Sequence, residues 1–402
     1  MNAKRYFTGG FSLVLGLCFG VCAQCRGAIW NLTDADFRSR SVQIDSIDKQ
    51  GIHTSSETVP WEDVLEIWRS APPQADTTGR LNLCFRTGDK ITGEPASFNG
   101  DAIQWNAAEL GPVAFSVDSV AGIVRSGYAA DDLDETRTDD VVRLANGDTT
   151  HGIVTNISPG GVTIQAGDAT PTLPWDSISA VLFSSGPGNS PSADRRMFRV
   201  HLTDNESFIV PDIGLSADLF AITLDDKTTR QIDPNLILEV EQLNGPIGWL
   251  TSRKPASNVY KPMFSENFPA RFDRTVGDDR PISEKFPGFH HGIGCHSYSK
   301  LTYDLTGKWA AFRTQFAIDS DSPLADVTAR IYLDDKLVYE QKNVKAGRIW
   351  DAVTIPLHGA KTLSLEVDYG ENYATEDRFV WLDPALIRKL PDTTASTTLP
   401  SN

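Results

Sequence analysis

The sequence predicts an all-β fold class, in which tandem small antiparallel β-barrel or meander repeats precede a jelly-roll β-sandwich. Related short motifs recur through the first 245 residues. Apolar and polar residues alternate over short segments bounded by turn residues, which is the pattern of half-buried strands. The last third combines dense aromatic residues with closely spaced strand-like runs and no helical period. A chain of 402 residues also exceeds the roughly 250–300 residues that one core supports, so several domains are expected.

Residues 1–28 predict an exported protein. Lys4 and Arg5 precede an apolar run at 11–21, and small residues follow it, which is the pattern of a secretory signal peptide. Three cleavage points fit, after Ala23, Cys25 or Ala28. A retained membrane anchor is the alternative, although the run is shorter than the roughly 20 residues of a spanning helix. We expect the chain to reach the periplasm, the cell surface or the extracellular space.

A motif recurs at the end of each predicted repeat. Its copies read Val59-Pro60-Trp61-Glu62-Asp63-Val64, Phe115-Ser116-Val117-Asp118-Ser119-Val120, Leu173-Pro174-Trp175-Asp176-Ser177-Ile178 and Ile232-Asp233-Pro234-Asn235-Leu236-Ile237. A short apolar strand follows each copy, and Thr87-Gly88-Asp89 and Asn146-Gly147-Asp148 supply hairpin turns in two units. We therefore predict four β repeats, at residues 30–70, 81–126, 141–184 and 197–245. The unit weakly resembles the small Sm-like or SH3-like barrels.

Trp61 and Trp175 occupy matching positions in this motif, and two interpretations are open. The rings are either exposed stacking platforms or plugs that fill the core or edge of each unit. A Trp in a Pro-Trp-acidic step before an apolar strand favours the plug.

The charge of the chain argues against a nucleic-acid partner. The formal net charge is −16 and the isoelectric point is near 4.9, whereas binding to a phosphate backbone depends on Lys and Arg. An acidic surface does not hinder the binding of a neutral sugar. Cys84 and Cys295 lie in different predicted domains, so we expect two buried free thiols and no disulfide framework.

The chain changes character after residues 246–263, which we predict to be a linker. Strand-like runs follow at 300–304, 310–317, 327–333, 352–355, 362–367 and 379–381. Turns such as Asp334-Asp335-Lys336 separate them. We predict a β-sandwich at residues 264–390 and a disordered polar tail at 391–402.

The motifs of this region carry a family resemblance. They are Gly292-Ile293-Gly294-Cys295-His296-Ser297, Leu301-Thr302-Tyr303-Asp304-Leu305, Phe316-Ala317-Ile318-Asp319, the runs at 327–338 and 357–365, and Asp377 with Trp381. In these motifs and their order, residues 264–389 resemble the NPCBM/NEW2 carbohydrate-binding modules. The resemblance implies a galactose-binding-like jelly roll, whose ligand is a sugar held by loops at one end, and it implies no catalysis.

A sugar site needs an aromatic face for the C–H side of the ring and hydrogen-bonding groups for the hydroxyls. Five residues are the carbohydrate-binding candidates: His296, Tyr298, Asp377, Arg378 and Trp381. Trp350 is a looser candidate. A core role is the alternative for Trp381 and a structural role for His296. Arg378 stands where the family often has His, so the identity of the sugar is not carried over.

Metal binding is expected only as a structural calcium ion in the sandwich, with oxygen ligands from Asp319, Asp321 and Asp368. No other cofactor is predicted. A further group has the chemistry of zinc ligands: His290, His291, Cys295 and His296. Their spacing matches no standard zinc site, and side chains alternate along a strand, so we predict no zinc there.

These observations predict an exported, non-catalytic protein that binds a glycan or polysaccharide. No catalytic motif of a hydrolase, metalloprotease, phosphate-binding or dinucleotide-binding enzyme occurs. The alternative is a cell-surface scaffold, in which the repeats contact a protein partner and the sandwich no longer binds sugar.

Overall fold

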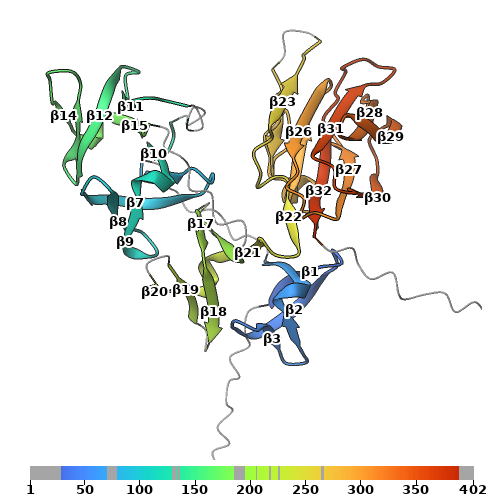
Figure 1. Ribbon diagram of the computed structural model, residues 1–402, viewed down its shortest axis with the longest axis horizontal. Helices are drawn as coiled ribbons and strands as arrows, with labels where there is room; N and C mark the ends of the chain where they lie inside the picture. The colour runs from blue at the N-terminus through green and yellow to red at the C-terminus, as the bar shows by residue number, and fades with distance from the viewer. Residues whose placement is uncertain are drawn as a thin grey trace, which may run out of the picture.

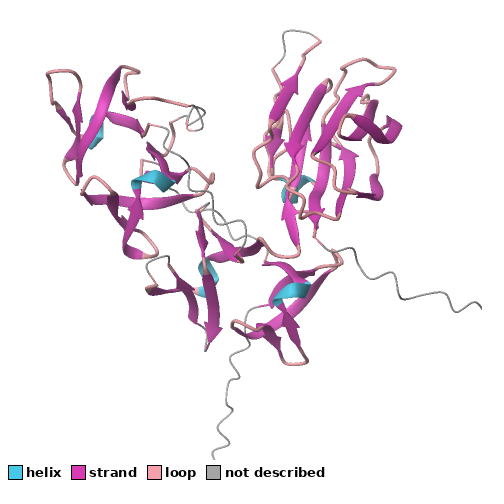
Figure 2. Cartoon of the chain, viewed as in Figure 1, coloured by secondary structure: helices cyan, strands magenta, loops and turns pink. Residues whose placement is uncertain are grey.

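The computed structural model of the protein describes residues 29–69, 79–128, 133, 136–184, 195–204, 206–216, 219–224, 227–263 and 267–388. The predicted signal peptide and tail lie outside the described residues. Regular structure is almost entirely β-strand (Figure 2), which confirms the predicted all-β fold class. Figure 1 shows four small β units formed by the first part of the chain and one larger sandwich formed by the last part.

The four small units have the same order of elements. Unit 1 contains β1 (Ile29–Asp34), β2 (Ser39–Ile47), β3 (Gly51–Thr54), β4 (Thr58–Pro60) and β5 (Val64–Trp68). Unit 2 contains β6 (Leu81–Phe85), β7 (Lys90–Phe98), β8 (Ala102–Ala107), β9 (Gly111–Ser116) and β10 (Val120–Arg125). Unit 3 contains β11 (Asp140–Leu144), β12 (Thr149–Ser158), β13 (Gly161–Gln165), β14 (Thr172–Leu173) and β15 (Ile178–Leu182). Unit 4 contains β16 (Met197–Leu202), β17 (Ser207–Val210), β18 (Asp212–Ser216), β19 (Leu219–Thr223), β20 (Thr229–Ile232) and β21 (Ile237–Leu243).

The motif at the end of each unit forms a short 3-10 helix before the last strand. These helices are η1 (Trp61–Asp63), η2 (Val117–Ser119), η3 (Trp175–Ser177) and η4 (Pro234–Leu236). Trp61 and Trp175 are buried, and the indole nitrogen of each donates a hydrogen bond of 2.8 Å to a backbone carbonyl of its own unit. Both rings are therefore core plugs, as the motif favoured, and not exposed stacking platforms.

The units are open meanders. In units 1, 2 and 3 the first strand pairs with the second and with the last, and the second, third and fourth follow one another in antiparallel order. Unit 4 differs because its second strand is divided into β17 and β18. Within the described residues, no pairing joins β4 to β5 or the equivalent strands elsewhere, so no barrel closes.

The units associate in pairs through their last strands. β5 pairs with β21 and β10 with β15, so unit 1 joins unit 4 and unit 2 joins unit 3. The same arginine contact crosses both junctions: Nε of Arg69 donates to the Ile237 carbonyl, and Nε of Arg125 donates to the Ile178 carbonyl. Each acceptor is the first residue of the partner's last strand, so the two pairs share one mode of assembly.

The C-terminal third forms a sandwich of two sheets. The six-stranded sheet contains β22 (Ile247–Trp249), β24 (Arg271–Phe272), β25 (Gly292–Cys295), β32 (Phe379–Ile387), β27 (Ala311–Ile318) and β30 (Ile349–Pro356). The five-stranded sheet contains β23 (Ser257–Tyr260), β26 (Ser299–Asp304), β31 (Thr362–Tyr369), β28 (Val327–Leu333) and β29 (Lys336–Val344). A one-turn helix, α1 (Ile282–Lys285), lies between β24 and β25 in the chain. The core between the sheets is aromatic and includes Tyr303, Phe316 and Trp381.

The prediction that residues 246–263 form a linker is wrong, because this segment belongs to the sandwich. β22 pairs with β32, and β23 pairs with β26, so each adds a strand to one of the two sheets. A polar, proline-containing stretch between the two short strands resembled a linker in composition. The backbone hydrogen bonds of both strands are nevertheless made with the sandwich.

Unit 1 packs directly on the sandwich. Leu65 of β5 shares a buried apolar cluster with Ile247, Trp249 and Ala385 of the six-stranded sheet. Phe37 extends this contact, with its ring 5.9 Å from that of Trp249 in an edge-to-face arrangement. The first and last parts of the chain are thus joined by apolar burial as well as by the polar contacts described below.

Candidate functional site

The register of two neighbouring strands brings three of the five predicted site residues to one end of the sandwich. β25 pairs with β32 so that Cys295 lies opposite Phe379. The residues just beyond this pair, His296 and Ser297 on one side and Asp377 and Arg378 on the other, therefore meet where the two strands enter their loops. We call these four residues the end-loop cluster. Their meeting depends on strand register, because about 80 residues of chain separate them.

Hydrogen bonds fix the buried part of this cluster. The hydroxyl of Ser297 donates to Oδ2 of Asp377, and the backbone N–H of Asp326 donates to Oδ1 over 3.3 Å. His296 is 5% exposed and Asp377 is fully buried. The imidazole of His296 stacks on Phe268, with ring centroids 5.0 Å apart. These residues form a rigid base and have little surface left for a ligand.

Arg378 is half-buried and lies against the 275–280 loop, whose backbone conformation at position 277 requires glycine. A Cβ atom on Gly277 would lie 2.8 Å from Nε of Arg378, and Gly277 has a φ of +104°. A side chain there would both strain the backbone and collide with the guanidinium. Arg378 is therefore positioned over the 275–280 loop, as the member of the cluster that offers hydrogen-bond donors at the surface.

Burial of Asp377 predicts a pH dependence of stability. Burial is the main cause that raises the pKa of this carboxyl to about 7. The stabilising neutral form is fully populated below the unfolded pKa of about 4, so stability is lost as the pH rises through about 7. Between about pH 5 and pH 8 we expect the sandwich to lose about 2 kcal/mol of unfolding free energy. Hydrogen exchange of β25 and β32 measures this loss.

Asp377→Asn is the matched variant, because an amide keeps the shape and cannot ionise. We expect the variant to hold its exchange protection up to about pH 8, where the parent protein loses it. An equal slope with pH in both proteins would show that another group causes the dependence.

Trp381 was expected to contact the sugar, and the structure corrects this. The side chain is completely buried, with its ring 4.9 Å from that of Phe379 and 5.7 Å from that of Phe316. No face is open to solvent, so the ring cannot stack on a sugar. Trp381 belongs to the family motif, but its side chain packs in the core of the sandwich.

Tyr298 lies on a different surface from the end-loop cluster. Its hydroxyl donates to Oε2 of Glu366 over 3.0 Å, and Tyr332 donates to the other oxygen of the same carboxylate. Arg330 contacts Glu366 over 2.9 Å as well. These side chains belong to strands of the five-stranded sheet or to the residue beside it, so Tyr298 stabilises a polar network there.

The three carboxylates predicted to bind calcium are paired with basic side chains. The ammonium of Lys285 lies 2.5 Å from Asp321 and 3.3 Å from Asp319. Asp368 forms an ion pair of 2.7 Å with Arg330. In the part of the chain that the structure describes, these three residues form no common group of metal ligands. The predicted triad is therefore corrected, while calcium binding by the module stays a prediction.

An exposed aromatic residue near the end-loop cluster was missed. Tyr373 is 67% exposed and lies in the loop that leads from β31 to Asp377. Asn372 fixes this loop by donating to the Leu324 carbonyl over 2.8 Å. An aromatic residue within the polar stretch Glu371-Asn372-Tyr373 was the available signal. Tyr373 presents the open ring face that Trp381 lacks.

Two cavities of the described residues lie away from this cluster. One of about 640 Å³ is formed between units 2 and 3 beside Arg125 and Trp175, and another of about 640 Å³ lies where unit 1 meets the sandwich beside Phe37 and Arg313. The end-loop cluster is instead an arrangement of loops at the end of the two sheets.

One further expectation concerns the two cysteines of the described residues. Cys84 and Cys295 are buried free thiols, as expected. Burial raises the pKa of both thiols, to about 11 for Cys84 and about 12 for Cys295, so neither is a reactive thiolate. No helix among the described residues is long and apolar enough to cross a membrane.

The C-terminal third is a two-sheet sandwich that gathers polar side chains where β25 and β32 enter their loops. Residues 249–387 match the family model of the NPCBM/NEW2 domain. The C-terminal third is a domain of this family, as the motifs indicated. The match begins within β22, so the family boundary also includes most of the segment that was predicted as a linker.

The chain is also similar in part to solved structures that contain CBM51 modules. One is the CBM51 module of Clostridium perfringens GH95 in complex with methyl-galactose, with 20% identity, coverage of 35% of this chain and 99% of that chain, and a TM-score of 0.30. Another contains the tandem CBM51 modules of Sp3GH98, the family 98 glycoside hydrolase of Streptococcus pneumoniae SP3-BS71, with 11% identity, coverage of 89% and 87%, and a TM-score of 0.30. A comparison with curated proteins finds no match.

Proposed function

We propose that the protein is an exported, non-catalytic carbohydrate-binding protein whose end-loop cluster, together with Tyr373, binds a sugar. The observation that carries the proposal is the NPCBM/NEW2 match over the sandwich. The geometry supports it by gathering hydrogen-bonding groups and one exposed aromatic ring at the same end of the module.

Each residue has a separate role in this proposal. The ring of Tyr373, which is 67% exposed, stacks on the C–H face of the sugar. Arg378 donates hydrogen bonds to hydroxyl groups from its position over the 275–280 loop. The buried pair Ser297 and Asp377 holds the ends of β25 and β32 in register. In this way the pair keeps the spacing between Tyr373 and Arg378, the two residues that contact the ligand.

Two substitutions test the assignment in the full-length chain. We expect Tyr373→Ala and Arg378→Ala each to weaken binding of the preferred sugar at least about tenfold, which corresponds to about 1.4 kcal/mol. Titration calorimetry measures the loss. Both side chains have exposed surface, so the variants should keep the circular dichroism spectrum of the parent protein.

Matched controls are available on the same chain. Tyr128 lies just after β10 of unit 2 and is 43% exposed. Lys336 is an exposed cation and the first residue of β29. Tyr128→Ala and Lys336→Ala should bind the sugar as the parent protein does. Unchanged affinity in Tyr373→Ala and Arg378→Ala would show that the sugar is bound elsewhere.

The same titrations test whether sugar binding depends on calcium. Binding should be titrated with calcium present and with calcium chelated, because a structural ion in the sandwich would stabilise the loops that hold the sugar. Equal affinity in both conditions would remove calcium from the proposal and leave sugar binding intact.

A further inference from the structure

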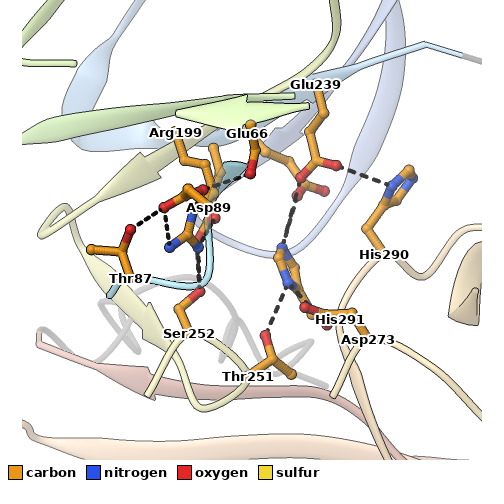
Figure 3. A network of polar contacts seen from close by, with 12 residues as sticks. Glu66, Thr87, Asp89, Arg199, Glu239, Thr251, Ser252, Asp273, His290 and His291 are labelled. Carbon is orange, nitrogen blue, oxygen red and sulfur yellow. Dashed lines mark hydrogen bonds and ion pairs between the residues drawn. The ribbon is translucent and has the colours of Figure 1, made fainter. Parts of the chain in front are cut away.

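A polar network lies where units 1 and 4 meet the sandwich. Glu66 is on β5, Glu239 is on β21, and the pairing of these strands places Glu66 opposite Glu241, two residues from Glu239. His291 immediately precedes β25 of the sandwich. Figure 3 shows Glu66 and Glu239 above the imidazole of His291, so residues from three parts of the chain converge here.

Three atoms of this network form a cluster with the spacing of metal ligands. Nε2 of His291 lies 3.4 Å from Oε2 of Glu66 and 3.9 Å from Oε1 of Glu239. Among the described residues, these three side chains make up the one group whose ligand atoms all lie within 4.8 Å of one another. A tetrahedral zinc ion with bonds of about 2.1 Å would hold its ligand atoms about 3.4 Å apart, which is close to both distances from Nε2 of His291.

The remaining polar atoms of two of these side chains are held by neighbours. Oε1 of Glu66 accepts a hydrogen bond of 2.9 Å from Thr33. Nδ1 of His291 lies 3.2 Å from the hydroxyl of Thr251 and 3.5 Å from a carboxylate oxygen of Asp273. A metal-binding histidine typically donates its other ring N–H to a carboxylate, which fixes the ring and directs the free nitrogen at the ion.

The atoms that point into the cluster lack hydrogen bonds. Oε2 of Glu66, Oε1 of Glu239 and Nε2 of His291 are buried, and none makes a hydrogen bond with any residue that the structure describes. Glu66 is 4% exposed and His291 is 5% exposed. The three atoms contact one another only as ion pairs of 3.4 and 3.9 Å. A buried polar atom without a hydrogen bond costs about 1–3 kcal/mol, so a common partner held between them would satisfy all three.

Arg199, the permanently charged cation of this network, is already paired with other carboxylates. The guanidinium of Arg199 contacts Asp89 over 2.9 Å and Glu241 over 3.2 Å, so one cation serves two buried carboxylates. Glu66, Glu239 and Asp273 add further negative charge around His291 (Figure 3). The missing partner is therefore expected to be a cation.

We propose that Glu66, Glu239 and His291 bind a divalent transition-metal ion of the zinc type, which links units 1 and 4 to the sandwich. One imidazole nitrogen and two carboxylate oxygens suit such an ion, and a fourth position remains for water. The ion gives the cluster its common partner and balances the buried carboxylates. It thereby fixes the orientation of the repeats relative to the sugar-binding module.

Metal content tests this proposal. The full-length chain is purified without a metal-affinity step, incubated with zinc and freed of excess ion by gel filtration. We expect about one zinc per chain by mass spectrometry of the metal. Glu66→Gln and His291→Asn should each weaken zinc binding at least about 100-fold, because each removes a ligand. His358→Asn is the control, since His358 is an exposed histidine outside the network.

A second measurement uses the parent protein and so does not depend on whether the ligand variants fold. Zinc is removed from the parent protein with a chelator and then restored, while hydrogen exchange is followed in β5, β21 and the residues before β25. We expect exchange in these segments to slow at least about tenfold on reloading. A parent protein that retains no zinc and exchanges equally in both states would overturn the proposal, and would leave a protonated His291 as the partner of the two carboxylates.

Discussion

Replacing Trp381 with alanine is expected to lower the free energy of opening of the sandwich by about 3–5 kcal/mol. The indole is completely buried between the two sheets and contacts Phe316 and Phe379 in edge-to-face geometry. Alanine would leave a cavity that neighbouring β-strands cannot fill without breaking their register. This is the largest effect we expect from a single apolar truncation in the module.

Hydrogen exchange followed by mass spectrometry measures this effect by segment. Protection should fall in β27 and β32 and remain unchanged in β12 of unit 3, which does not touch the module. Trp381→Phe is the control: it keeps most of the apolar surface, and the indole nitrogen makes no hydrogen bond within the described residues. A variant Trp381→Ala that is stable but binds no sugar would instead support a ligand-contacting role for Trp381.

Replacing Arg199 with methionine is expected to destabilise the junction of units 2 and 4 by about 3–5 kcal/mol. The guanidinium lies between Asp89 and Glu241, whose side chains are 3% and 2% exposed. Its Nη1 also donates to Ser252 of the sandwich over 3.0 Å. Methionine fills a similar volume but leaves two buried carboxylates without their cation.

Urea denaturation monitored by exchange in β16 and β21 measures the loss. Arg196→Met is the matched control on the same unit, because Arg196 is more exposed and its contact with Glu62 is 3.8 Å long; we expect a change below about 1 kcal/mol. Adding Asp89→Asn and Glu241→Gln to Arg199→Met should restore part of the stability. No restoration in the triple variant would show that packing, and not charge, determines the effect.

The fold class was predictable because its signals are local. The Pro-Trp-acidic motif forms a 3-10 helix and a buried plug within a few residues of its own strand, as at Trp61 and Trp175. Alternating strands and turn residues likewise define each meander through neighbours in the chain. The pairing of unit 1 with unit 4 had no such signal, because it depends on contacts between β5 and β21, far apart in the sequence.

The candidate site was predictable only in part, for the same physical reason. The motif around His296 and the pair Asp377 and Arg378 meet because of the register between β25 and β32. Trp381 was misassigned because β32 is buried on both faces: Phe379 and Trp381 face the core, while Val380 and Leu382 are covered by Ile282 and Phe286. A strand covered on both sides shows no alternation that would separate core from surface.

The histidines before β25 show the same limit. Spacing along the chain argued against a zinc site made of His290, His291, Cys295 and His296 alone. The acidic partners of His291 come from β5 and β21, and no local pattern relates those strands to the sandwich. Only the packing of the units on the module brings these residues together.

The central claim, that this chain binds a glycan through its C-terminal module, is tested most directly by a glycan array probed with the full-length chain. Galactose-type sugars should be prominent on the array, with calcium present and chelated. We expect saturable binding to one class of sugar, which Tyr373→Ala and Arg378→Ala each weaken at least about tenfold and Tyr128→Ala retains. A folded protein that binds no glycan would contradict the claim and favour a cell-surface scaffold that contacts a protein partner through its repeats.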